Sequence, residues 1–236
     1  MMDVRRVESP PASAAALPAR RPGLADVASL PLAPSTQQAL DRLAADMHGG
    51  AIWRKRKYAE ARGLLGLAQI APRVVVLELD LRTELTALVE LRDTPVPCMA
   101  PGADDIHLEH RAVLVLQFPE ELLAGPIAGT RPARILEPRP VFHANVSYGG
   151  PVQVLCLGAS VPRGFPLREM LLTSYAALTL QSISLDAMDP AGVLNPIASG
   201  WWQANASRIP LTTTPFLGRR EAGPPQAGAS DREGGS

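Results

Sequence analysis

The sequence is poor in cysteine and aromatic residues and has no long hydrophobic run. Cys98 and Cys156 are the only cysteines among 236 residues, too few for a disulfide framework, and with four histidines they show none of the close spacings of a zinc site. Acidic and basic residues balance at 23 each, which excludes the strongly basic field of a dedicated nucleic-acid-binding protein. The longest apolar stretch, around 170–183, is interrupted by polar residues, and the N-terminus lacks the apolar segment of a signal peptide. We therefore expect a cytoplasmic protein without metal or other cofactor that contacts neither nucleic acid nor membrane.

What the sequence does contain is enough apolar material for a packed core. Hydrophobic residues make up 46% of the chain and aromatic residues 4%, so the core is expected to consist mainly of Leu, Val, Ile and Ala. Residues 1–34 are rich in Pro, Ala and Arg without a sustained period, and residues 218–236 are rich in Gly, Pro and polar residues. Both segments are predicted to be disordered tails, which leaves one domain over 35–217.

The hydrophobic pattern predicts helices at both ends of the domain and consecutive strands between them. In chain order, the expected elements are a helix capped by Ser35 or Thr36, a helix over 51–67, strands over 74–79, 86–91, 112–117 and 134–142, and helices over 167–184 and 197–207. Pro138 and Pro140 should shorten the fourth strand or confine it to an edge. Because the strands are grouped together, we predict an α+β fold with an antiparallel sheet.

A series of local motifs carries a family resemblance. In chain order, the motifs are Phe118-Pro119, Pro132, Val141-Phe142-His143-Ala144-Asn145-Val146 and Leu155-Cys156-Leu157. This series resembles the centre of ubiquitin-conjugating enzymes, in which a strand ends in Phe-Pro and His-Pro-Asn precedes a cysteine flanked by Ile or Leu. The similarity runs in order over 50–208 and is close over 118–198. It implies a ubiquitin-conjugating-enzyme-like fold with an N-terminal helix, a four-stranded antiparallel meander and C-terminal helices.

Three departures from the family pattern indicate a divergent, bacterial member. Ala144 stands where the family has proline, the interval from Asn145 to Cys156 is longer, and the segment before His143 is stretched through 125–129. The longer interval predicts an inserted flap over 148–151. Bacterial members commonly occur beside genes for an activating enzyme, a ubiquitin-like protein and a JAB-type peptidase, and some such clusters serve antiphage defence.

The resemblance implies two acyl transfers at Cys156. An activating enzyme would deliver a ubiquitin-like protein as a thioester on this thiol, and an amine of a protein acceptor would then attack the same carbonyl. Asn145 would either donate to the oxyanion or hold the Cys156 loop in shape. His143 is expected to support the loop through backbone hydrogen bonds, and Asp189 either orients the incoming ammonium or serves as a turn residue before Pro190.

The basic run Arg54, Lys55, Arg56 and Lys57 lies where the family's first helix contacts the activating enzyme. It would either steer that partner electrostatically or be a solvated helix face. Lys55 and Lys57 are also the only lysines. This scarcity reflects either a GC-rich genome or a need to leave few amines open to the protein's own reactive intermediate.

Two other hypotheses remain open. The same fold could serve as a non-catalytic binding module or scaffold for a ubiquitin-like protein or its activating enzyme. A cysteine hydrolase would instead need His143, His107 or His110 beside Cys156, and no known hydrolase motif surrounds that cysteine. Cys98 lies outside every motif and receives no role.

Overall fold

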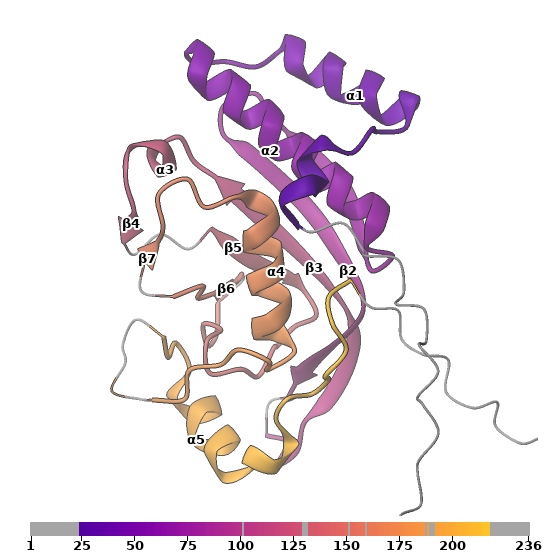
Figure 1. Ribbon diagram of the computed structural model, residues 1–236. Helices are drawn as coiled ribbons and strands as arrows, with labels where there is room; N and C mark the ends of the chain where they lie inside the picture. The colour runs from indigo at the N-terminus through magenta and orange to yellow at the C-terminus, as the bar shows by residue number, and fades with distance from the viewer. Residues whose placement is uncertain are drawn as a thin grey trace, which may run out of the picture.

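The computed structural model describes residues 24–100, 102–128, 132–150, 152–158, 160–186, 188 and 192–217. Its elements, in chain order, are η1 (Leu24–Ser29), α1 (Pro34–Ala45), α2 (Ala51–Ile70), β1 (Val74–Asp80), β2 (Leu85–Cys98), β3 (His107–Phe118), α3 (Glu121–Ala124), β4 (Ile127–Ala128), β5 (Ala133–Glu137), β6 (Gln153–Leu155), β7 (Ser160–Val161), α4 (Leu167–Leu178), α5 (Pro196–Ala204) and η2 (Ala206–Arg208). Helices α2 and α4 lie on one face of the main sheet, and α5 lies beyond its lower end in Figure 1. The predicted α+β class is confirmed.

The main sheet is antiparallel and has five strands in the order β1-β2-β3-β5-β6. The prediction of four strands was therefore wrong. The missing strand is β6, only three residues long, which pairs Leu155 with Ala133 of β5. β4 and β7 form a separate two-stranded sheet. The predicted strand over 134–142 ends at Glu137, because Pro138 cannot donate to a strand ladder.

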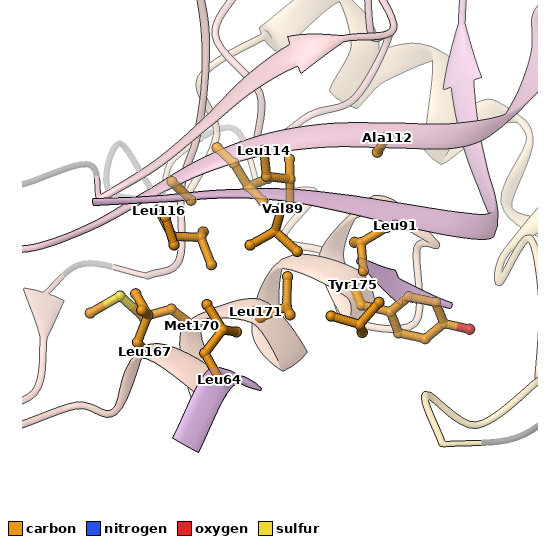
Figure 2. Close-up of a cluster of buried hydrophobic side chains, with 14 of the residues drawn as sticks. Leu64, Val89, Leu91, Ala112, Leu114, Leu116, Leu167, Met170, Leu171 and Tyr175 are labelled. Atoms are coloured by element: carbon orange, nitrogen blue, oxygen red, sulfur yellow. The ribbon is translucent and has the colours of Figure 1, made fainter. Parts of the chain in front are cut away.

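The core lies between the sheet and the two helices, as Figure 2 shows. Alternate residues of β2 face inward with no exposed surface, as do residues of β3 and α4; the side chains labelled there include Leu64, Val89, Leu91, Leu114, Leu116, Leu167, Met170 and Leu171. Burial of each such Leu or Val side chain stabilises the fold by about 1.5–3 kcal/mol relative to exposure. The period of two in the strands and near 3.6 in the helices produces this single apolar layer.

A second, smaller core holds α5 against the chain that leads to the site. Trp202 is fully buried, and its Nε1–H donates to the carbonyl oxygen of Phe142 at 3.0 Å. Trp201 packs edge-on against Phe142, with ring centroids 5.9 Å apart. Both tryptophans are packing residues, and they fix the position of the residue that precedes His143.

The folded part begins earlier than residue 35. Within η1, Val27 is fully buried, and a Cβ on Gly66 of α2 would come within 2.4 Å of the Val27 carbonyl oxygen. Only glycine permits this close approach of the η1 backbone to α2. Residues 24–34 therefore pack on the domain, which corrects the predicted tail boundary. The predicted tails over 1–23 and 218–236 lie outside the described residues.

Candidate functional site

The candidate site is built around a hairpin that brings Cys156 to Asn145. The N–H of Cys156 donates to the carbonyl oxygen of Asn145 at 2.8 Å, and the N–H of Ser147 donates to that of Val154 at 2.9 Å. Val146 and Leu155, the residues between them, form an isolated bridge and are both fully buried. Two buried apolar residues thus anchor the hairpin, and Ser147 and Cys156 beside them are partly exposed.

Cys156 lies in a shallow groove of about 160 Å³ between the hairpin, α4 and the segment after it. Its side chain is partly exposed, and the Sγ–H donates to the carbonyl oxygen of Gly158 at 3.5 Å. Thr173 of α4, Ser184 and Gly192 form other parts of the wall, and each described residue that lines the groove is uncharged. A carbonyl group bound to this sulfur would therefore lie among neutral side chains.

The Asn145 side chain ties the far wall of the groove to the hairpin. Its Nδ2 donates to the carbonyl oxygens of Ser184 at 3.0 Å and Gly192 at 2.6 Å, and its Oδ1 accepts from the Ser184 N–H at 3.1 Å. The residue is 5% exposed. Because both amide hydrogens are already donated, this geometry favours the loop-holding role over that of an oxyanion donor.

His143 supports the same loop through both nitrogens of its ring. It is fully buried; Nε2 lies 2.8 Å from the Ala177 carbonyl oxygen, and Nδ1 accepts from the Asn145 N–H at 2.9 Å. These partners require a neutral ring with its proton on Nε2. Burial lowers the pKa of His143 to about 4. Both ring nitrogens are engaged with backbone, which agrees with the expected structural role and leaves no lone pair for Cys156.

Gln153 is a site residue that the sequence analysis missed. It is 4% exposed, and its Oε1 accepts from the Val141 N–H at 2.7 Å. Its Nε2 donates to the carbonyl oxygens of Val141 at 3.0 Å and Ser147 at 3.1 Å. This amide clamps both arms of the hairpin three residues before the thiol. The sequence feature that could have revealed this residue is a lone glutamine inside the apolar run 152–157, since a polar side chain there must find buried hydrogen-bond partners.

The basic run at the start of α2 is not one exposed face. Arg54 and Lys55 are exposed, whereas Arg56 donates to the Gly164 carbonyl oxygen at 2.7 Å and pairs with Glu60 at 2.7 Å. Lys57 is fully buried. Positions 53, 57, 60 and 61 of α2 share the inward face at helical spacing. Of the four predicted partner-binding residues, only Arg54 and Lys55 are therefore positioned to meet a partner through an exposed side chain.

Lys57 instead holds two loops together. Its Nζ donates to the carbonyl oxygens of Leu81 at 2.7 Å, His48 at 2.9 Å, Thr83 at 3.0 Å and Arg82 at 3.1 Å. The ammonium also lies 5.4 Å from the centre of the Trp53 ring. Burial lowers the pKa of Lys57, and the nearby Glu120 and Asp80 carboxylates oppose that shift.

The remaining candidates lie elsewhere. Asp189 falls outside the described residues. Cys98 is 1% exposed, and burial raises the pKa of its thiol to about 12. His107 and His110 lie on the part of β3 remote from β6. His110 is six positions before Leu116, which is level with Leu155, and this spacing is roughly 20 Å along the strand. With His143 engaged by backbone, this arrangement argues against a cysteine hydrolase.

Among the described residues, no group of three or more His, Cys, Asp or Glu side chains could hold a metal ion. The described helices are all too short or too polar to cross a membrane. Comparison of the chain with protein-family models, curated proteins and solved structures gives no match.

Proposed function

We propose that this chain is a conjugating enzyme for a ubiquitin-like protein, which it carries as a thioester on Cys156 and transfers to an amine acceptor. The observation that carries the proposal is the position of the Cys156 thiol. It is partly exposed in an open groove, and its loop is held by the Asn145 of the His-x-Asn motif. A buried cysteine would be inert, whereas a thiol reached by solvent can attack a large acyl donor.

The order of elements lends further support. A helix precedes the antiparallel meander, the thiol follows its last strand, and α4 then crosses the inner face of the sheet (Figure 1). The family resemblance implies the same order, although the sheet here has one strand more.

The proposed chemistry needs little from the protein beyond position. The Cys156 thiolate attacks the thioester that joins the ubiquitin-like protein to an activating enzyme. The thiolate of the activating enzyme is the leaving group. The neutral acceptor amine later attacks the new thioester, the C–S bond breaks, and the Cys156 sulfur leaves as a thiolate. The nitrogen gives up one proton, which the thiolate takes, and an amide remains. Asn145, His143 and Gln153 act as positioning residues that fix the hairpin on which the sulfur lies.

A charging assay tests the proposal. The full chain is incubated with a cognate activating enzyme, ATP and the ubiquitin-like protein, and the products are separated with and without reducing agent. We expect one adduct that thiols remove, that Cys156→Ala abolishes and that Cys156→Ser converts to a thiol-stable ester. Cys98→Ala is the matched control, since that sulfur is buried, and it should still be charged.

The same assay separates the non-catalytic alternative. Binding of the ubiquitin-like protein or of the activating enzyme without any covalent adduct would support a scaffold and overturn the enzymatic proposal. An adduct that persists in Cys156→Ala would overturn the assignment of the thiol.

A further inference from the structure

The two lysines of the chain, two residues apart on α2, have opposite environments. Lys57 is fully buried, and four backbone carbonyl oxygens at 2.7–3.1 Å surround its ammonium. An amine can attack a carbonyl only when it is neutral and its lone pair is accessible. Lys57 meets neither condition, because its ammonium hydrogens point at these oxygens and no path from solvent reaches the nitrogen.

Lys55 is the opposite case. Its side chain is exposed on the outer face of α2, and it makes no hydrogen bond or ion pair with the part of the chain that the structure describes. No other lysine occurs among the 236 residues. Lys55 is therefore the one side-chain amine of the sequence that a reactive acyl group could meet without unfolding.

We propose that Lys55 is the self-modification site of this protein, the lysine to which the charged form transfers its own ubiquitin-like protein. The proposal rests on the proposed function, which supplies the thioester. A protein that carries an activated acyl group can lose it to accessible amines of its own surface, and Lys55 is the exposed lysine of this sequence.

The step balances without a further reactant. The Lys55 ammonium loses one proton to water, and the neutral amine attacks the thioester carbonyl carbon. The C–S bond breaks as the C–N bond forms, the Cys156 sulfur leaves as a thiolate, and the nitrogen gives up a second proton that the thiolate takes up. The products are an isopeptide bond on Lys55, the Cys156 thiol and one proton released to solvent. Because the new amide carries no charge, the modification also removes one positive charge from the exposed pair Arg54 and Lys55.

The first turns of α2 contact the chain segment that follows the site. Arg56, the residue after Lys55, donates to the carbonyl oxygen of Gly164 at 2.7 Å. Gly164 lies eight residues after Cys156, so the first turns of α2 are anchored to the chain segment that leaves the groove. The thioester of one molecule can also meet the amine of another in solution, so the transfer requires no contact between the two side chains within one chain.

Self-transfer is tested by charging the full chain, removing the activating enzyme, and following the adducts that survive reducing agent. Peptide mapping is expected to place them on Lys55. The isopeptide product is measured relative to the thioester formed in the same reaction, so that any change in charging cancels. Lys55→Arg, which keeps the positive charge and removes the nucleophile, should lower this ratio at least tenfold. The matched variant Arg54→Lys in the Lys55→Arg background restores an exposed amine one residue away and should restore self-transfer.

A second experiment, chemical acylation of the two lysines, distinguishes failure of this proposal from failure of the proposed function. An amine-acylating reagent applied to the native chain should modify Lys55 at least tenfold faster than Lys57, and the difference should vanish in denaturant. Self-adducts on Lys57, or on hydroxyl groups as hydroxylamine-sensitive esters in place of Lys55, would overturn the proposal while leaving the thioester function intact. Equal acylation rates of the two lysines in the native chain would overturn the environments on which it rests. Failure to form any thioester on Cys156 would remove the proposed function, and self-transfer with it.

Discussion

The N–H of Cys156 donates to the carbonyl oxygen of Asn145 at 2.8 Å, so the thiol and the His-x-Asn motif belong to one hydrogen-bonded hairpin. The side chain of the same asparagine extends in the other direction and holds Ser184 and Gly192. Asn145 thus holds in position both the loop that carries the sulfur and the opposite wall of the groove.

Replacement of Asn145 by alanine is expected to destabilise the fold. The variant loses three hydrogen bonds, one buried and two partly buried, and removes the Asn145 donor from the Ser184 and Gly192 carbonyl oxygens, a cost of about 2–4 kcal/mol. Urea unfolding at neutral pH measures it. Asn195→Ala is the matched control, since that side chain accepts one bond, from the Ala198 N–H at the start of α5, and should cost about 1 kcal/mol. Unchanged stability of Asn145→Ala together with lost acyl transfer would instead support an oxyanion donor.

His143 should make the stability of the protein depend on pH below neutrality. The pKa of its buried ring lies at about 4, against 6.5 for an ordinary histidine. Between these values the unfolded chain binds a proton that the folded chain refuses, so stability is full above pH 6.5 and falls as the pH drops toward 4. The total effect of such a difference is roughly 3 kcal/mol, with about 2 kcal/mol of it lost between pH 7 and pH 5.

Urea midpoints at a series of pH values test this prediction. His143→Gln should be less stable at pH 7 but should lose less stability on acidification than the parent chain. His110→Gln, which alters an exposed histidine, should keep the parent's pH dependence. An identical slope for the parent and His143→Gln would assign the effect to other groups.

Particular residues show how much of the fold could be predicted from the sequence. Leu85, Ala87, Val89 and Leu91 alternate inward, and the predicted strand over 86–91 covers this part of β2. The grouping of consecutive strands predicted the antiparallel class. β6 has only three residues, too few for any period, and its strand character comes from pairing with β5. Sequence patterns report continuous faces well and short paired segments poorly.

The candidate site was likewise predicted only in part. The family resemblance implied that His143 and Asn145 support the Cys156 loop, and the hydrogen bonds of both residues agree with that role. The clamp made by Gln153 did not follow from the sequence, since its partners are backbone groups that any residue could supply. The burial of Lys57 was also not predicted. Its positive charge led us to expect an exposed side chain, but its position on α2 places it beneath a turn whose carbonyl oxygens surround the ammonium.

Lys57→Met is expected to be strongly destabilising. Methionine retains most of the side-chain volume but leaves the carbonyl oxygens of His48, Leu81, Arg82 and Thr83 without this donor, which should cost at least about 3 kcal/mol. Lys55→Met removes the same charge from an exposed position and should change stability by less than about 0.5 kcal/mol. Thermal or urea unfolding of the pair measures the difference. Similar midpoints for the two variants would contradict the anchoring role of Lys57.

The two thiols should differ sharply in reactivity toward an alkylating reagent. Only a thiolate reacts, and at pH 8 a thiol with the pKa of about 12 assigned to Cys98 is ionised in about one molecule in ten thousand. Cys98 is also 1% exposed, whereas Cys156 opens onto the groove. Native protein treated with iodoacetamide should therefore gain one adduct, on Cys156, at least a hundredfold faster than on Cys98. Cys156→Ala should resist the reagent until urea exposes the remaining thiol. Labelling of Cys156 only after unfolding would mean that its sulfur is not accessible in the folded chain, and neither the thioester nor any transfer that depends on it could then form.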